Sequence, residues 1–408
     1  MRALEIAGSL EHFQRRGPGT DSERRAARWL AAELEETGRE VVIEPFWCRP
    51  NWPLAHVWHI ALALAGSLTM VSSPRVGGAL VLAALVFVLA DVFTGRSPGR
   101  WLTRQSASQT VVALPPPSRH ASDQNLRLVI TANYDAGRAG LAFRDLLRRP
   151  AVALRRLAGG FTLGWLGWLS IAMVWLLVVA IIRLQGHNST GAGLAQLPPT
   201  IGLVLGLALL LELATSELSP AGGDNGSGVG VAIELARALD AAPPRHLGVE
   251  VVLTGAGDRE GLGLADYLRR RRRTMRRTNT AVLGIGACTA GSPCWWSSAG
   301  TLFPVRSAPR MKRLAAQVAQ QESELNVIRH SDRGFTPALP ALSARIPAIA
   351  IGAITEDGRV SRSHQRDDTA AAIDSAAVEQ VVEFGLMLID AIDASLAESQ
   401  RAPAPTRA

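Results

Sequence analysis

The sequence of 408 residues has little cysteine, and its spacing excludes several kinds of site. The three cysteines, Cys48, Cys288 and Cys294, cannot form a disulfide framework, and none lies in a Cys-x-x-Cys pair or near a histidine at zinc-finger spacing. We therefore expect free thiols. The first residues also lack an uninterrupted apolar segment of signal-peptide length, because charged residues such as Glu5 and Glu11 break it. Export through a cleaved signal is not expected.

Lysine is also scarce, so the formal net charge of +8 comes almost wholly from arginine. This excess of arginine could reflect the nucleotide composition of the gene as readily as a charged partner. No basic groove interleaved with aromatic residues, and no nucleic-acid reading motif, accompanies the charge. The sequence therefore predicts no nucleic-acid partner.

Hydrophobic residues, in contrast, make up 48% of the chain, which is high for a purely soluble protein. Much of this content lies in four apolar segments, at residues 52–71, 76–93, 161–182 and 200–214. A helix of about 20 apolar residues crosses the ~30 Å hydrocarbon core of a bilayer. The segments predict two transmembrane hairpins, residues 52–93 and 161–215. A buried core helix is the alternative for each segment, most of all for the short fourth one.

Arginines flank the hairpins on the side of the soluble segments. Arg49 precedes the first hairpin, Arg100 follows it and Arg148 precedes the second, whereas the turns inside the hairpins carry few arginines. By the positive-inside rule, we expect both termini and the soluble domain in the cytoplasm of a bacterial-type plasma membrane.

Four ionisable residues, His56, His59, Asp91 and Glu212, lie within or near the apolar segments. Such residues are costly in a bilayer and often functional. We expect them at helix ends and interfaces, without a paired relay. Transport by the four helices is therefore a disfavoured function.

Outside the hairpins, short apolar strands alternate with helical segments. This order predicts an α/β domain with a mixed central sheet sandwiched by helices. The domain would be assembled from three stretches and followed by a disordered Pro/Ala-rich tail at residues 397–408; the stretches are residues 1–51, 94–160 and 216–396.

Two basic segments could touch the membrane surface. Residues 140–160 form a basic amphipathic stretch suited to the bilayer interface, with a soluble surface helix as the alternative. Residues 269–277, RRRRRTMRR, could draw the domain onto anionic lipid or could simply be a solvated helix end.

Residues 219–239, SPAGGDNGSGVGVAIELARAL, form a glycine-rich loop that leads directly into a helix. Such a loop turns sharply and can hold a carboxylate, here Asp224, at the rim of a pocket. Taken alone, it is equally typical of an ordinary helix start.

The glycine-rich loop is one of several motifs in a characteristic order. ITANYDAG precedes it, and VVLTGAGDREGLGLADYL, AVLGIGA, ARIPAIAIG and RSHQRDDT follow. Together these segments resemble the zinc-dependent exopeptidases of metallopeptidase family 28, clan MH, which includes bacterial aminopeptidases and glutaminyl cyclases. The resemblance implies a zinc-exopeptidase (phosphorylase/hydrolase-like) fold and a hydrolase ancestry.

The resemblance also implies which residues would bind metal. The family's bridging aspartate matches Asp224, its glutamate ligand matches Asp258, and its last histidine matches His364. These three could hold one zinc ion, although Asp258 is one methylene shorter than glutamate. The ligands of the second metal fall on Asn133 and Gly286, so a second zinc site is not expected.

Two further family positions concern catalysis. Asp135 matches the aspartate that orients the first metal histidine, and the general base falls on Gly257, which has no side chain. Glu260 is a weak substitute, and a surface glutamate is the alternative. A positioned base typically contributes about 10²- to 10⁴-fold in rate.

We therefore expect a pseudopeptidase that acts as a binding or scaffold module for a peptide or protein terminus. A one-metal hydrolase, similar to an aminopeptidase or a glutaminyl cyclase, is the alternative. Because the second hairpin follows Asn133, near the ends of the strands, we also expect the pocket to face the bilayer surface and membrane-borne ligands.

Overall fold

The computed structural model describes residues 2–116, 126–144, 146–148, 163–186, 189–331 and 334–401. Its strands are β1 (Val41–Cys48), β2 (Ser106–Ala113), β3 (Leu126–Asn133), β4 (Leu247–Thr254), β5 (Thr280–Ile285), β6 (Ser292–Trp296), β7 (Ser298–Ala299), β8 (Val305–Arg306), β9 (Ile328–His330) and β10 (Ala348–Ile354). The longer helices of the soluble domain are α1 (Arg2–His12), α2 (Asp21–Glu35), α9 (Gly228–Ala241), α10 (Leu262–Arg270), α11 (Pro309–Gln321) and α13 (Ser375–Arg401). Shorter ones are α5 (Pro98–Trp101), α12 (Leu339–Ser343), η1 (Leu141–Phe143), η2 (Gly222–Ser227), η3 (Ser323–Leu325) and η4 (Ala370–Ala372).

Eight strands form one mixed sheet in the order β1-β2-β4-β3-β5-β10-β6-β9. The central strands β4, β3, β5 and β10 are parallel, and β2 and β6 are antiparallel to their central neighbours. The central strands are buried on both faces, which explains their nearly continuous apolar sequence. The predicted mixed α/β sheet is confirmed.

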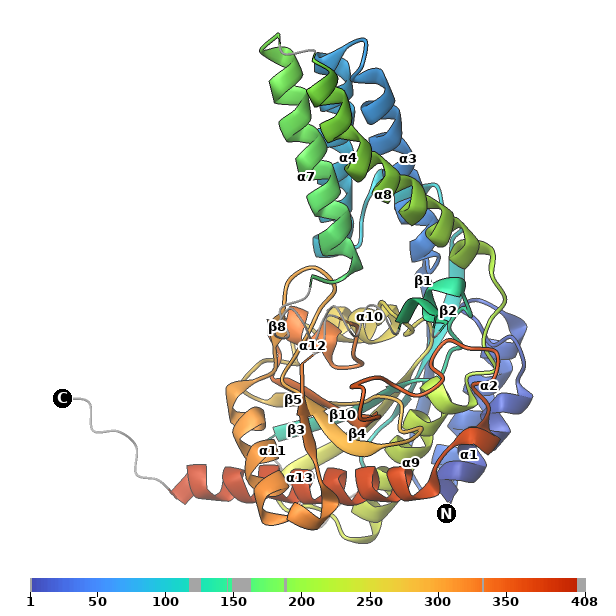
Figure 1. Ribbon diagram of the computed structural model, residues 1–408. Coiled ribbons are helices and arrows are strands. Elements are labelled where there is room, and N and C mark those ends of the chain that lie inside the picture. The colour runs from blue at the N-terminus through green and yellow to red at the C-terminus, as the bar shows by residue number, and fades with distance from the viewer. Residues whose placement is uncertain are drawn as a thin grey trace, which may run out of the picture.

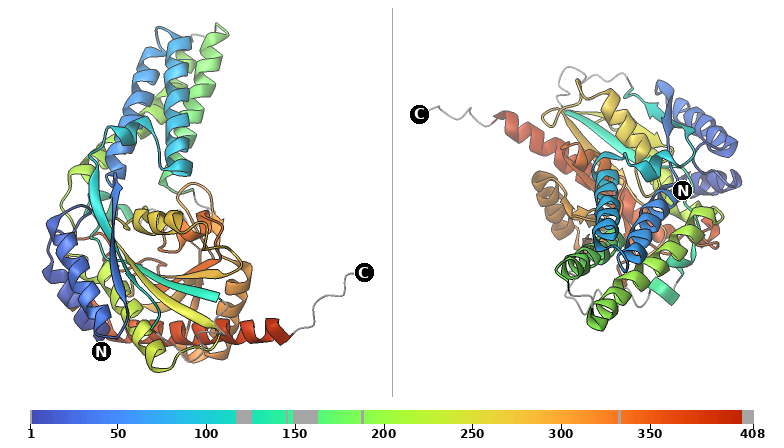
Figure 2. Two further views of the ribbon diagram at one scale, coloured as in Figure 1. Left: turned by 180° about the vertical axis from the view of Figure 1, so that it is seen from behind. Right: turned by 90° about the horizontal axis from the view of Figure 1, so that it is seen from above.

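Helices cover both faces of this sheet (Figures 1 and 2). Alternate strand residues such as Leu128 and Val251 face the larger core, which packs against α1, α2, α9, α11 and α13. Their neighbours Val129 and Val252 face a smaller core beneath α10 and α12. The period of two along each strand thus supplies two apolar layers.

The remaining helices, α3 (Trp52–Thr69), α4 (Pro74–Thr94), α7 (Trp165–Leu184) and α8 (Thr190–Thr215), project together from the domain (Figure 1). Each contacts two neighbours, so that the four form a closed bundle around one apolar core. α4, α7 and α8 are long and apolar enough to cross a membrane. α3 is not apolar enough to be counted with these three helices, because His56 and His59 lower its mean hydropathy.

The first hairpin packs through two glycines. A Cβ atom on Gly77 would lie 2.5 Å from the carbonyl oxygen of Gly66, and one on Gly66 would lie 2.8 Å from that of Gly77. Small residues at a helix crossing let two backbones approach closely, as in many membrane proteins. The outer surface of the bundle is strongly apolar, with exposed side chains that include Trp58, Leu68, Val86, Trp175, Ile181, Ile201 and Leu205.

Both hairpins leave the sheet at one edge. Cys48 ends β1 opposite Ser106 of β2, so residues 49–105 form an insertion in a strand hairpin. Since β1 and β4 are each antiparallel to β2, the end of β1 lies on the same side as the ends of β3 and β4, where Asn133 pairs with Thr254. The second hairpin is the next long helical segment after β3, and α7 begins at Trp165. The bundle therefore stands at the carboxyl edge of the parallel strands, where α/β folds bind ligands.

The structure corrects some predicted boundaries. α8 begins at Thr190, ten residues before the predicted segment, and passes through Pro198 and Pro199. Thr200 donates a hydrogen bond to the carbonyl of Gln196, and contacts of this kind let apolar helices tolerate proline. The last helix continues to Arg401, into the predicted tail. Residues 402–408 and most of the stretch 140–160 lie outside the described residues.

Candidate functional site

The residues singled out by the sequence come from connections that follow the parallel strands. Asn133 and Asp135 end and follow β3, Gly257 and Asp258 follow β4, and His364 lies after β10. All but Asn133 and Gly257 line a cavity of about 150 Å³, together with Asn51 to Pro53 at the start of α3 and Leu213 near the end of α8. The cavity therefore faces the base of the helical bundle.

Asp135 supports the loop after β4. Its carboxylate accepts hydrogen bonds from the backbone N–H groups of Gly257, at 2.9 Å, and Asp258, at 3.2 Å. Burial, and then the charges of Asp258 and Glu23, hold the pKa of Asp135 well above its ordinary range. Asp135 therefore fixes the backbone of the loop, and the position to which the resemblance assigns a metal-binding histidine holds Asn133.

Asn133 and Gly257 occupy one space. A Cβ atom on Gly257 would lie 2.2 Å from Oδ1 and 2.4 Å from Cγ of Asn133, closer than real Cβ contacts allow. Asn133 is held in this position because its Oδ1 accepts a hydrogen bond of 2.8 Å from the hydroxyl of Thr254. The positions to which the resemblance assigns the base and the first histidine thus compete for the same space.

His364 is surrounded by protein groups on every polar atom. Its Nδ1–H donates to the carbonyl oxygen of Arg138 at 3.0 Å, and its Nε2 accepts from Nε–H of Arg259 at 3.1 Å. Phe143 stacks on the imidazole at 4.4 Å, and the guanidinium of Arg259 lies 4.6 Å from the centre of the Phe143 ring. The ring nitrogen that would face a metal is therefore already used.

Asp258 reaches the same nitrogen, with its Oδ1 3.4 Å from Nε2 of His364. Nε2 cannot accept from Arg259 and also donate to Asp258, so we assign the shorter contact as the hydrogen bond. Burial raises the pKa of Asp258, and the charge of Arg259 lowers it; His364 lowers it as well only while its ring is protonated, a state in which Nε2 cannot accept from Arg259. A carboxyl group and a guanidinium thus flank one imidazole.

Asp224 lies apart from these two residues. Its carboxylate accepts a hydrogen bond from the hydroxyl of Ser363, and its backbone N–H donates to the carboxylate of Asp368 at 3.1 Å. Burial, and then the charge of Asp224, raise the pKa of Asp368 to about 8. Asp224 does not line the cavity that Asp258 and His364 share.

The predicted zinc ligands Asp224, Asp258 and His364 are therefore not brought together. Among the described residues, no three His, Cys, Asp or Glu side chains form a cluster that could hold a metal ion. The occupied Nε2 of His364 gives the physical reason, so the residues present do not fit the family's zinc. Gly286, at the other lost ligand position, has room for a side chain, since its Cβ would meet nothing closer than 3.5 Å.

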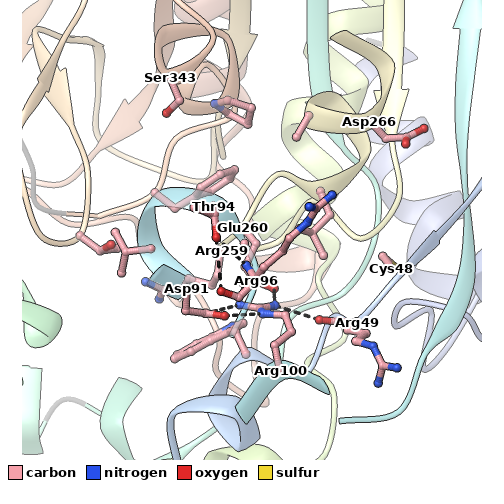
Figure 3. A pocket seen from close by; sticks show the side chains of 18 of the residues that line it. Cys48, Arg49, Asp91, Thr94, Arg96, Arg100, Arg259, Glu260, Asp266 and Ser343 are labelled. Atoms are coloured by element: carbon pink, nitrogen blue, oxygen red, sulfur yellow. Dashed lines mark hydrogen bonds and ion pairs between the residues drawn. The ribbon is translucent and has the colours of Figure 1, made fainter. Parts of the chain in front are cut away.

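Glu260 is neither a surface residue nor a base ready to act. Its side chain is largely buried, and its two oxygens accept hydrogen bonds from the guanidinium of Arg100, the longer of them 3.0 Å. Arg100 also holds both carboxylate oxygens of Asp91, at 2.7 and 2.9 Å (Figure 3). The charge of Glu260 is thus neutralised by an ion pair that links its loop to α4.

This ion pair belongs to a buried polar chain that the sequence analysis did not expect. Nε2 of His56 lies 3.6 Å from Asp91, and Nδ1 of His56 lies 3.3 Å from Nδ1 of His59. These three residues lie near helix ends, as expected, but the expectation that they are unpaired was wrong, because α3 and α4 pack side by side and turn them toward each other. The chain connects the base of the bundle with the loop after β4 through Arg100.

A second buried arginine, Arg16, was also missed. Its guanidinium donates to the carbonyl oxygens of Tyr134, at 2.8 Å, Pro220, at 2.9 Å, and Ala221, which ties the end of β3 to the glycine-rich loop. Burial lowers its pKa to about 10, so it remains charged at neutral pH. No pattern distinguishes Arg16 in an arginine-rich sequence. Arg259 had a usable signal, since it follows a predicted ligand position directly.

The fold is that of zinc-dependent exopeptidases. A leucine aminopeptidase precursor from Bacteroides thetaiotaomicron has 14% identity and a TM-score of 0.53, covering 95% of this chain and 96% of its own. A glutaminyl cyclase from the same organism has 13% identity, a TM-score of 0.54 and the same coverage. A Zn-dependent exopeptidase from Parabacteroides distasonis has 11% identity and a TM-score of 0.52, covering 96% of both chains.

The sequence model of the family described as "Peptidase family M28" matches residues 212–389, which contain the glycine-rich loop, β4 and the segment around His364. The match covers less than half of the chain and agrees with the family that the order of the motifs predicted. No curated protein matches the chain significantly.

Proposed function

We propose that this protein is a membrane-embedded pseudopeptidase, whose M28 domain binds a ligand and does not cleave it. The observation that carries the proposal is the contact between Arg259 and His364, in which a guanidinium occupies the ring nitrogen that faces a metal in the family. A permanent cation at this position supplies positive charge between Asp258 and His364 without an open coordination site.

The absence of a base supports the same conclusion. Gly257 carries no side chain, Asn133 fills the space beside it, and Glu260 is neutralised by Arg100. A reaction that depends on proton transfer would lose its acceptor together with its metal. Neither loss is compensated by another acidic side chain of the described cavity.

Membrane embedding is supported by the bundle. α4, α7 and α8 have the length and composition of membrane spans, and α3 completes the bundle with its two histidines turned inward and Trp58 and Leu68 turned outward. We propose that all four helices cross the bilayer, with both termini and the M28 domain on the cytoplasmic side, as the flanking arginines predict.

The ligand that fits the cavity is a peptide or protein terminus. The volume of about 150 Å³ is below the 300 Å³ or more typical of small-molecule sites, which favours a single terminal residue. Asp258 would attract an α-amino group, and the lining residues Asn51 to Pro53 at the start of α3 support a membrane-borne partner. Partners of this kind include the termini of other membrane proteins.

Metal analysis tests the proposal. Protein purified in detergent with zinc in the buffer is expected to hold well under 0.1 zinc per chain after desalting and to show no aminopeptidase or glutaminyl cyclase activity. Arg259→Ala should free Nε2 of His364 and raise zinc uptake, whereas Arg259→Lys, which keeps the positive charge, should not. Stoichiometric zinc in the unaltered protein that disappears in His364→Ala would overturn the proposal.

A one-metal hydrolase is the second candidate. One observation favours it, namely that Asp258 and His364 direct their side chains to one point, with 3.4 Å between Oδ1 and Nε2. Release of an amino acid from an aminoacyl-p-nitroanilide, sensitive to chelator and to His364→Ala, would establish this function.

A further inference from the structure

A second and much larger cavity, of about 880 Å³, lies where the helical bundle meets the M28 domain (Figure 3). Its walls come from β1, α3, α4, α5, α7, α10 and α12. Trp52, Arg259 and Glu260 are the lining residues that it shares with the cavity of about 150 Å³ beside His364. The cavity depends on the inserted helices, since residues 49–105 and the start of α7 supply about half of its lining. It is therefore a feature that the M28 fold by itself does not contain.

The polar lining of this cavity has an excess of positive charge. It contains five arginines and three carboxylates, and each carboxylate is already paired within the protein. Arg100 forms ion pairs with both Asp91 and Glu260, and Arg269 pairs with Asp266. Among the described residues, Arg49 and Arg96 form no ion pair. The cavity thus presents uncompensated guanidinium groups to an anionic ligand.

Arg49 is held in place for such a role. Its Nη1 donates to the backbone carbonyl oxygens of Trp101, at 3.0 Å, and Thr103, while its own carbonyl oxygen accepts from Arg100 at 2.9 Å. Both donated bonds use Nη1, so Nε and Nη2 of Arg49 have no partner within the described part of the chain. A fixed guanidinium with two remaining donors is suited to bind the oxygens of a phosphate.

The surroundings indicate where the ligand comes from. Trp47 and Trp101 line the cavity with exposed fractions of 70% and 64%, and Trp52 and Trp165 lie at the first turns of α3 and α7. Tryptophan gathers at the boundary between lipid and water, where its ring is apolar and its N–H is polar. Farther from the soluble domain, the outer faces of α4 and α7 expose apolar side chains such as Val86 and Ile171.

We infer that this cavity binds the phosphate-bearing head group of an anionic phospholipid, an inference that rests on the proposed membrane embedding. Arg49 and Arg96 contact the phosphate, the tryptophans surround the glycerol region, and the acyl chains lie against α4 and α7. Arg259 and Glu260 also line this cavity, so a bound lipid head group would lie beside the loop after β4 that contributes to the smaller cavity.

Lipid binding to the purified protein in neutral detergent tests the inference. The probes are dioleoyl phosphatidylglycerol and, as a matched uncharged lipid, dioleoyl phosphatidylcholine, measured by native mass spectrometry and by thermal unfolding. We expect phosphatidylglycerol to remain bound and to raise the unfolding temperature, and phosphatidylcholine to do neither. Equal effects of the two lipids would overturn the inference.

The double variant Arg49→Gln, Arg96→Gln is expected to bind phosphatidylglycerol about tenfold or more weakly, because each arginine near a head group contributes to binding. Arg24→Gln, Arg28→Gln is the matched control, since it removes the same charge from the exposed face of α2 and should change nothing. Arg96→Gln alone, at an exposed position, should still weaken binding if the double variant does not fold. Unchanged affinity in Arg96→Gln and the double variant would overturn the assignment.

Two further experiments distinguish a lipid from a free phosphate ester as the ligand, and membrane embedding from lipid binding. Glycerol phosphate, the soluble head group, should not stabilise the protein at the lipid's concentration; if it does so equally well, the site reads a free phosphate ester and the lipid assignment is overturned. Release of the protein from membranes by alkaline carbonate would overturn the embedding itself. An embedded protein without a lipid preference would overturn this inference alone and leave the pseudopeptidase proposal standing.

Discussion

Nε of Arg259 lies 3.1 Å from Nε2 of His364, and this contact places a permanent cation where the resembled enzymes hold zinc. Asp258 lies beside it, with its Oδ1 3.4 Å from the same nitrogen. A guanidinium can neither activate water nor accept a proton, and the pseudopeptidase proposal rests on this contact.

A side chain at position 257 is expected to destabilise the protein. Gly257→Ala places a Cβ atom 2.2 Å from Oδ1 of Asn133 and should cost about 1–3 kcal/mol of unfolding free energy, as overpacking usually does. Asn133→Gly should rescue much of this loss in the double variant. Gly286→Ala is the control, because its nearest contact would be 3.5 Å. Thermal unfolding in detergent measures all four, and additive losses at positions 133 and 257 would show that the two residues do not share this space.

Removing the cation from the buried ion pair should be severe. Arg100→Met leaves the carboxylates of Asp91 and Glu260 buried without their partner, which typically costs about 3–5 kcal/mol. The triple variant with Asp91→Asn and Glu260→Gln should recover a large part, since no unpaired charge remains. Equilibrium unfolding by denaturant compares the three proteins. A loss in Arg100→Met below about 1 kcal/mol would mean that water reaches and screens these groups.

The close contact of α3 and α4 should not tolerate a large residue. Gly77→Leu would push a side chain into the backbone of Gly66 and Met70 and should prevent the hairpin from closing, at a cost of about 3 kcal/mol or more. Gly202→Leu on α8 is the matched control, because no atom lies within 4 Å of its Cβ position. The yield of monodisperse protein in gel filtration and its unfolding temperature report the difference. Equal behaviour of the two variants would contradict the packing.

Stability is expected to fall as the pH rises through the range in which Glu23 titrates. Burial raises the pKa of Glu23 from its ordinary 4.5 to about 7, against hydrogen bonds from Ser108, Gly19 and Ala256. Because the folded state holds this proton more tightly than the unfolded state, its stabilising effect is complete below pH 4.5 and is lost by pH 7, a change of roughly 3 kcal/mol.

The variant Glu23→Gln checks this assignment. It should begin less stable at pH 4.5, since its amide cannot accept from the N–H of Gly19, and the difference from the unaltered protein should narrow as the pH approaches 7. Unfolding temperatures at matched ionic strength measure the difference. Parallel curves over this range would show that Glu23 titrates normally.

The sequence by itself determined the alternation of strands and helices, the order of the M28 motifs and the two apolar hairpins. These features are local or sequential: a period of two or of 3.6, a run of apolar residues, a glycine-rich turn before a helix. The sequence also shows by itself that positions 257 and 286 carry no side chain that could act as a base or as a metal ligand, because both are glycine. The identity of the fold followed from motif order alone.

Tertiary structure decided what the surviving residues do. Asp224, Asp258 and His364 look equivalent as possible ligands in the sequence, yet Ser363 and Asp368 hold the first, while Arg259 caps the last. Glu260, His56 and Asp91 acquired their roles from Arg100 and from the side-by-side packing of α3 and α4. Such pairings join residues far apart in the chain, and no sequence period encodes them. The physical reason is that a buried polar group must find a partner wherever the fold supplies one, and only the assembled fold determines where that is.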